Sequence, residues 1–458
     1  MNTVFLIALI IYLIIFLIIG IRELKSIHGF KDYSAAGKNQ TTFAVVMTLM
    51  ATMVGASTTI GITDTVYKIG FPGIWWLAFG ALGLILQSFF ISERVRRIDA
   101  DTLPDLAGKT AGRPAQLLIA LIIAVSWIGV VAGQLAAMNS LVTYALGRSS
   151  RGIFVIVAVI VILYTLTGGQ LSVIKTDRFQ LLIILAGVAA CMIFLYAVKG
   201  GNTAEVADNI ELLNENYGPS NLFIQFFVIG GVFFLGPDIL SRNFVSGNEK
   251  TAKRSALISG LFLLCFAVMI TLTGMWIRYN VTPEQLGDSG ALMYAASLLP
   301  KGLSVLLIFG LLSAILSSTD TCLINASVIL AKDVFKKESV PFVRIAVILI
   351  GGLSLLLVLL GRGDIMSLLS GAYSVYTPGV IFPLTVAIFA YEKHGVRIGP
   401  WLAGVIAGGL FGIAGTYFGT ALKSFGLPDA AAPYLPIIGM GLSLILSLLS
   451  VRRQPCRE

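Results

Sequence analysis

Charged side chains are scarce in this sequence. They make up 12% of its 458 residues, whereas 57% are hydrophobic and the mean hydropathy is +0.91; soluble domains carry about 25% charged residues. Only 2 histidines and 4 cysteines are present, and the cysteines show neither a disulfide framework nor metal-site spacing. A histidine proton relay, a transition-metal centre and a soluble catalytic domain are therefore not expected. The composition predicts an all-α polytopic membrane protein that is not an enzyme.

Apolar runs fill most of the sequence. A run of about 20 apolar residues is long enough to cross a bilayer as a helix, and the pattern predicts thirteen transmembrane helices. A shorter segment, residues 289–299, predicts a helix lying over the outer face. The predicted spans cover residues 3–21, 42–70, 72–93, 116–146, 152–167, 173–198, 220–244, 254–277, 302–331, 342–361, 365–391, 399–421 and 433–451.

The net charge of +9 is distributed unevenly, in a way that argues against nucleic-acid binding. Lys and Arg are about three times as frequent in the predicted inner loops as in the outer ones, which is the positive-inside pattern of a membrane protein. It predicts a multi-pass protein of the cell membrane (plasma or inner), with the N-terminus outside and the C-terminus inside. Its expected surroundings are the lipid bilayer, and no obligatory protein partner is evident.

Asp320 lies inside one of the longest apolar runs. A carboxylate at that depth costs roughly 2.5–3.5 kcal/mol, so it marks an ion site or a pathway by default. On a helix, Ser313, Ser317, Asp320 and Thr321 share one face. These are oxygen ligands only, which suit a hard cation rather than a transition metal. The alternative is a close helix–helix contact lined by small polar residues.

Two spans are interrupted by glycine. Gly55 and Gly61 bracket a polar cluster in the second span, and Gly236-Pro237 interrupts the seventh. A broken helix is tolerated at this depth where its backbone lines a cavity or meets an ion. Each interrupted span begins a set of five, which indicates two inverted repeats. The predicted domains are an extra helix at 1–24, repeats at 42–199 and 219–392, and two further helices at 398–452.

Five stretches, in order along nearly the whole chain, resemble the sodium:solute symporters, the family of the sodium–proline, sodium–pantothenate and sodium–glucose carriers. The stretches are Ala51–Gly61 with Tyr67 and Gly70; Thr102–Leu106; Thr167–Gly169 with Val173, Thr176, Asp177 and Gln180; Gly236–Asp238 with Arg242 and Lys250–Arg254; and Ala314–Thr321 with Asp333.

The resemblance implies a five-plus-five inverted repeat with discontinuous first and sixth core helices. It also implies a main sodium site made by the carbonyls of Ala51, Val54 and Ala314 and the hydroxyls of Ser317 and Ser318. Some members of the family have a second sodium site, whose positions here are Asp177, Ser317, Asp320 and Thr321. Those members carry serine where this chain has Asp320, so the second site and the sodium stoichiometry stay open.

The solute is expected to contact the broken segment and the third, sixth and tenth core helices. No Lys or Arg is expected in mid-span, which slightly favours a neutral or zwitterionic small organic solute. Asp177 could equally be a solvated loop residue, and Asp238 could form a helix-end salt bridge with Arg242. The candidate contacts are Ser57, Thr58, Thr59, Trp127, Gln134, Gln225, Phe226, Tyr373 and Tyr376.

The predicted function is sodium-coupled uptake of a small organic solute by alternating access. Proton coupling is one alternative, with Asp320 or Asp177 carrying the proton. A channel or a sensor on the same fold, without coupled uptake, is another. The only expected cofactor is the sodium ion itself.

Overall fold

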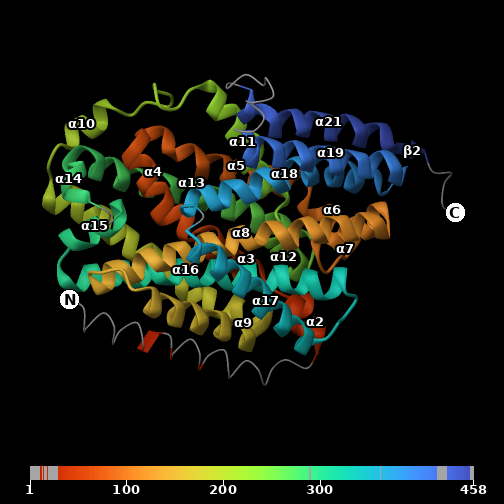
Figure 1. Ribbon diagram of the computed structural model, residues 1–458, viewed down its shortest axis with the longest axis horizontal. Helices are drawn as coiled ribbons and strands as arrows, with labels where there is room; N and C mark the ends of the chain where they lie inside the picture. Colours follow the sequence, from red (N-terminus) through yellow and green to blue (C-terminus); the bar gives the residue numbers. More distant parts are fainter. Residues whose placement is uncertain are drawn as a thin grey trace.

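The computed structural model describes residues 11, 12, 14, 18, 29–287, 290–361, 363–392, 394–419 and 431–453. Most of them are helical (Figure 1). The first half contains α2 (Phe30–Ala35), η1 (Ala36–Lys38), α3 (Thr42–Met53), η2 (Ser57–Gly61), α4 (Ile62–Ile69), η3 (Phe71–Ile74), α5 (Trp75–Phe90), α6 (Ser92–Ile98), α7 (Leu103–Ala111), α8 (Arg113–Leu146), α9 (Arg151–Phe194), η4 (Leu195–Lys199) and α10 (Thr203–Asp208).

The second half has the same character, with one small two-stranded sheet. Its elements are α11 (Pro219–Leu235), α12 (Pro237–Val245), α13 (Glu249–Asn280), α14 (Pro283–Leu286), α15 (Ala291–Leu298), α16 (Lys301–Ile329), η5 (Leu330–Val334), α17 (Val340–Leu359), α18 (Ile365–Ala390), β1 (His394–Val396), α19 (Ile398–Tyr417), η6 (Ala432–Tyr434), α21 (Leu435–Ser450) and β2 (Val451–Arg453).

The prediction of thirteen spans is confirmed only in part. Ten helices in the described ranges are long and apolar enough to cross a membrane, and the bent pair of α3 with η2 and α4 makes a possible eleventh. The apolar stretch Arg151–Leu166 is shorter than a typical span. The predicted first span, 3–21, lies outside the described residues apart from four isolated positions. The predicted helix at 289–299 is confirmed as α15.

Both predicted interruptions are present. The two halves of the first broken helix, Thr42–Met53 and Ser57–Ile69, meet at an angle of 59°. In the second, Gly236 is extended (φ −68°, ψ 143°) between α11 and α12. A third break falls in α9 at Gly169, where φ is 58°; this left-handed conformation favours glycine because it has no Cβ. Breaks of this kind free backbone groups inside the molecule.

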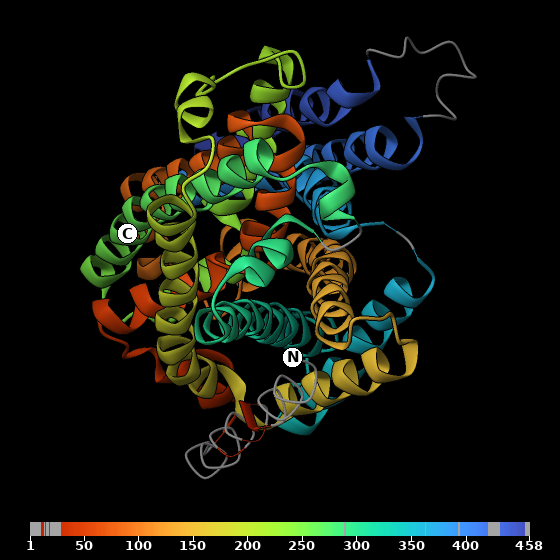
Figure 2. The same cartoon turned by 90° about the vertical axis from the view of Figure 1, so that its left-hand side faces the viewer.

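The broken helices surround α16, which runs through the middle of the molecule (Figure 2). In its most apolar window, 72% of the α16 span is buried, the largest share of any described span. It packs against α8, α9 and α3. The hairpin of α19 and α21 lies at the periphery instead, with 28% and 39% of its windows buried. The residues of α16 therefore face other helices, whereas α19 faces mostly outward.

The two ends of the helix bundle differ. The short helices α10, α14 and α15 gather at one end, and α6, α7 and the β1–β2 pair lie at the other (Figure 1). The helix α7 is capped at its start, because the Thr102 hydroxyl accepts a hydrogen bond from the Asp105 backbone N–H at 3.0 Å. This end also carries a dense network of acidic and basic side chains.

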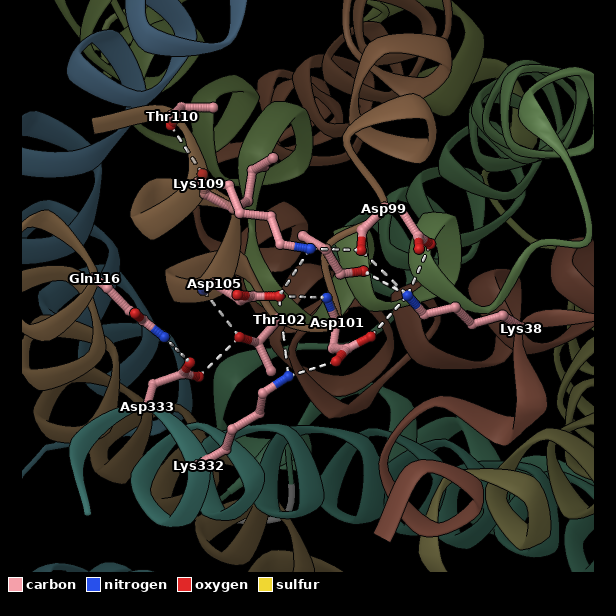
Figure 3. A network of polar contacts seen from close by, with 12 residues as sticks. Lys38, Asp99, Asp101, Thr102, Asp105, Lys109, Thr110, Gln116, Lys332 and Asp333 are labelled. Atoms are coloured by element: carbon pink, nitrogen blue, oxygen red, sulfur yellow. Dashed lines mark hydrogen bonds and ion pairs between the residues drawn. The ribbon is translucent and has the colours of Figure 1, made fainter. Parts of the chain in front are cut away.

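In this network, Lys38 and Lys332 both hold Asp101, with Nζ–Oδ distances of 2.7 and 2.5 Å (Figure 3). Burial raises the pKa of Asp101, but the hydrogen bonds and charges of Lys332 and Lys38 more than offset this and lower the pKa to about 2. The neighbouring Asp333 accepts hydrogen bonds from Thr102 and Gln116, each at 2.7 Å. The network therefore connects α7 and α8 with η1 and η5.

Candidate functional site

A cavity lies where the two broken helices face α8, α16 and α18. Its empty space, including the part open toward solvent, is about 510 Å³. Most of its wall is apolar or aromatic. The lining residues are Thr52, Met53, Gly55, Ser57, Thr58, Trp76, Trp127, Val130, Gln134, Val232, Phe233, Gly236, Asp238, Ile239, Ser318, Cys322, Leu369 and Tyr373.

The break after α3 frees backbone oxygens beside α16. In the described chain, no backbone or side-chain donor reaches the carbonyl oxygen of Ala51 or Val54; both residues are fully buried. The Ser318 hydroxyl lies next to them and donates to the Thr52 carbonyl at 2.9 Å. Buried carbonyls without a donor are costly unless another partner satisfies them. Together with the Ser318 hydroxyl, these carbonyls form a set of oxygens suited to a hard cation.

The hydroxyls of Ser317 and Ser318 donate hydrogen bonds to different acceptors. Ser317 donates to Asp177 Oδ1 at 2.6 Å, and Thr48 donates a short hydrogen bond to the other oxygen, Asp177 Oδ2. Asp177 is fully buried, so it is not the solvated loop residue that the sequence left possible. Ser317 thus lies between the candidate main sodium site and the candidate second site.

Arg242 is the positive charge of this region. Its Nη2 donates to Thr52 and Thr321 at 2.9 and 2.6 Å and lies 3.5 Å from Asp177 Oδ2. Arg242 lies in the last turn of α12 and is fully buried. Its ion pair is with Asp177 rather than with Asp238, the partner considered from the sequence. The guanidinium therefore occupies the space between two of the candidate second-site residues.

Asp320 faces a different neighbour. It is 1% exposed, and its Oδ1 accepts a hydrogen bond from Thr165 of α9 at 2.5 Å. Ser313, about two turns earlier on α16, shares a hydrogen bond of 2.6 Å with Tyr12. The polar stripe predicted on one face of this helix is thus divided among several partners, and its members do not converge on one point.

Several predicted solute contacts do line the cavity: Ser57, Thr58, Trp127, Gln134 and Tyr373. The Gln134 side chain has a partner in the broken helix, because its Oε1 accepts a hydrogen bond from the Ala56 backbone N–H at 3.2 Å. The Thr58 hydroxyl donates to the Met53 carbonyl at 2.8 Å. Both side chains therefore stabilise the broken backbone as well as bordering the cavity.

The other candidates lie outside its wall. Thr59 is fully buried and donates to the Gly55 carbonyl at 2.8 Å, and Tyr376 donates to the Leu235 carbonyl at 2.6 Å. Gln225 accepts a short hydrogen bond from Tyr217 and lines a separate pocket. Phe226 lines another pocket and packs edge-on against Phe79. The sequence identified these helices but not their rotation.

Sequence reasoning missed Asp238 as a cavity residue. It is 8% exposed and lines the cavity together with Trp76 and Cys322. A usable signal was present: Asp238 directly follows the Gly-Pro interruption in an otherwise apolar span, where a freed backbone is expected to border a cavity.

Comparison with known proteins decides the family. The sequence model of the "Sodium:solute symporter family" matches residues 33–406. The chain belongs to the sodium:solute symporter family. It is therefore a sodium-coupled solute symporter and not an enzyme.

Relatives within the family agree over most of the chain. An osmoregulated proline transporter of Bacillus subtilis is 25% identical and covers 99% of this chain and 96% of its own length. A sodium/proline symporter of Staphylococcus saprophyticus is 26% identical over 88% of this chain and 84% of its own length. A high-affinity choline transporter of Drosophila melanogaster is 24% identical over 89% of this chain and 70% of its own length.

Solved structures support the fold. A Na⁺-coupled sialic acid symporter in a substrate-bound outward-open state superposes with a TM-score of 0.81 at 18% identity, covering 99% of both chains. A nucleobase-cation-symport-1 family transporter superposes with a TM-score of 0.62 at 14% identity, covering 91% of this chain and 93% of its own. This symporter is thus an all-α, multi-pass membrane protein with the fold of other cation-coupled transporters.

Proposed function

We propose that this symporter binds sodium between the α3–η2 break and α16, and takes up a small organic solute through the adjacent cavity by alternating access. The proposed ligands are the carbonyls of Ala51, Val54 and Ala314 and the hydroxyls of Ser317 and Ser318. The observation that carries this assignment is the position of Ser318, whose hydroxyl lies against the broken backbone. Ion and solute then share one interrupted helix.

The solute would contact Ser57, Thr58, Trp127, Gln134 and Tyr373. Because the Bacillus relative is a proline transporter, a zwitterion of that size is the first solute to test. In this arrangement, sodium fixes the break and the fixed break completes the solute site. Binding of each would then increase the affinity for the other by the same factor.

The two repeats, 42–199 and 219–392, are proposed to move against each other around this site, with 1–24 and 398–452 as flanking helices. The proposed orientation puts the α6–α7 end in the cytoplasm, because most Lys and Arg lie in loops assigned to that side. The orientation can be tested in intact cells by replacing Lys301 or Lys336 with cysteine. An impermeant thiol reagent should label position 301 and not 336, and the reverse pattern would contradict the orientation.

Sodium-dependent uptake into proteoliposomes tests the sodium site. Ser318→Ala removes one proposed ligand and should raise the sodium half-saturation by about 10-fold or more, the scale of a lost bond to a charged group. Thr319→Val is the matched control on the same helix, because the Thr319 hydroxyl donates to the Ile315 carbonyl at 2.6 Å. An unchanged half-saturation in Ser318→Ala would rule out the assignment. Uptake driven by a proton gradient without sodium would favour the proton-coupled alternative.

A further inference from the structure

The central cavity contains a charge that the proposed sodium ligands do not use. Among the described residues that line it, Asp238 is the only charged one. The residue is 8% exposed. Arg242, one turn further along α12, makes its ion pair with Asp177. Asp238 is thus a buried anion whose close partners are neutral.

Those partners are all donors. Trp127 Nε1 donates to Oδ2 at 2.6 Å, and Cys322 Sγ donates to the same oxygen at 3.3 Å. Asn325 Nδ2 donates to Oδ1 at 3.0 Å. Donors directed at both oxygens stabilise the ionised carboxylate, which acts as acceptor only. They fix the carboxylate in place, and the charge of Arg242 acts on it only from beyond ion-pair distance.

Aromatic rings surround the same space. Trp76, Trp127 and Tyr373 all line the cavity, and the Tyr373 ring lies 6.4 Å from Trp76 and 6.5 Å from Trp127 between centroids. The faces of such rings attract cations, most strongly when the site is shielded from water. A carboxylate and several aromatic rings in one cavity favour a positively charged, partly apolar group.

We propose that Asp238 is the counter-ion of the solute, so that this symporter selects solutes with a cationic nitrogen, such as an amino acid or an organic ammonium ion. This inference rests on the proposed function, because it needs the cavity to be the solute site. It revises the neutral-or-zwitterionic expectation drawn from the sequence: zwitterions stay, organic cations are added and neutral solutes are excluded. Neutral solutes and anions without a cationic nitrogen leave the buried Asp238 without a cation within ion-pair distance, which is costly.

The first experiment needs no mutation. Purified protein in sodium buffer is heated with L-proline, choline, N-acetyl-L-proline, D-glucose or pantothenate. L-proline has a cationic nitrogen and a carboxylate, choline has the cation alone, and N-acetyl-L-proline has lost the positive charge. We expect a higher Tm with L-proline, choline or both, and no shift with the other three. The inference would be overturned if neither L-proline nor choline raises the Tm. It would also be overturned if N-acetyl-L-proline, D-glucose or pantothenate raises it.

The second experiment measures uptake of the stabilising cation. Asp238→Asn should raise its KM by about 10-fold or more, the scale of a lost charged hydrogen bond, with the sodium half-saturation changed less than about 2-fold. Asp238→Glu keeps the charge and should recover part of the affinity. Asp333→Asn is the matched control, because Asp333 is also buried and hydrogen-bonded but lies outside the cavity.

The outcomes separate this inference from the proposed function. Wild-type uptake that needs sodium, with a KM unaffected by Asp238→Asn, would leave the symporter assignment intact and refute the role of Asp238. Sodium-dependent thermal stabilisation of the Asp238→Asn protein shows that it is folded. If the Asp238→Asn protein does not fold, the thermal-shift experiment with the five compounds on the wild-type protein decides whether the inference holds.

Discussion

The interior of this symporter contains buried charged side chains. Asp177 and Arg242 are both fully buried, and the Arg242 guanidinium also binds Thr52 and Thr321. A cation from the protein itself thus stands where the resemblance implied a second sodium ion. Two cations a few ångströms apart repel strongly inside a protein. Arg242 would therefore compete for Asp177 with any second sodium ion.

A double-mutant cycle tests the coupling of this pair. Removing one partner of a buried ion pair costs about 3–5 kcal/mol, because it leaves the other charge uncompensated. We expect Asp177→Asn and Arg242→Gln each to lower the Tm in detergent, and the double variant to lose less than the sum of the two. Strictly additive losses would show that the two side chains are not coupled.

Asp320 gives a second prediction at this scale. It accepts a hydrogen bond from Thr165 of α9, which is not a proposed main-site ligand. Asp320→Asn keeps the volume and one acceptor oxygen, so the protein should fold. Any rise in the sodium half-saturation should be smaller than that of Ser318→Ala. A larger rise, measured by uptake at varied sodium concentration, would make Asp320 part of the main site.

At the scale of the helix, the two interruptions have different supports. The first is held by side chains: Gln134 binds the Ala56 N–H, and Thr58 binds the Met53 carbonyl. The second is set by the backbone, since Gly236 is extended and Pro237 begins α12. The first break should therefore be sensitive to single side-chain changes in its surroundings.

Gly55→Ala tests how closely α16 approaches the first break. A Cβ on Gly55 would clash with the Ser318 hydroxyl and lie 3.0 Å from Ser318 Cβ. We expect a higher sodium half-saturation even though Ser318 is intact. Gly230→Ala is the control, since the nearest atom to its added Cβ, the Phe79 carbonyl oxygen, is at an ordinary 3.5 Å. Equal effects of the two changes would argue against a specific Gly55–Ser318 contact.

The sequence could predict the breaks but not what each side chain faces. Gly55 and Gly236-Pro237 indicate a freed backbone from the local sequence alone. Oxygen-bearing residues at helical spacing likewise indicate that Ser317 and Ser318 belong to an ion site. The rotation of a helix, in contrast, depends on its packing against distant segments. For that reason Gln225 and Phe226 face other pockets, and Asp238 faces the cavity instead of pairing with Arg242.

At the scale of the whole molecule, the charged network joins segments far apart in sequence. Lys38 precedes α3, Asp101 precedes α7, and Lys332 follows α16 (Figure 3). These contacts connect both proposed repeats at the α6–α7 end. Alternating access would require some of them to break when that end opens.

Acid should weaken this network in a defined range. The pKa of Asp101 is lowered to about 2, whereas an unfolded aspartate titrates near 3.9. Its stabilisation is therefore fully present above about pH 4 and is lost as the pH falls toward 2. Asp101→Asn should lower the Tm at pH 6, and the difference from wild type should shrink between pH 4 and 2. A constant difference would exclude a contribution from ionised Asp101.

The peripheral hairpin of α19 and α21 has a consequence for the surrounding lipid. A helix of 20 residues, Ile398–Tyr417, is about 30 Å long, which equals the hydrocarbon thickness of a typical bilayer. Because so little of α19 is covered by protein, lipid chains must solvate most of its surface, and a thinner or thicker bilayer would force it to tilt or deform the lipid around it. Because α19 packs against α18, a tilt of α19 would also shift α18, which carries Tyr373. The length of the lipid acyl chains would therefore change how well the solute fits the cavity.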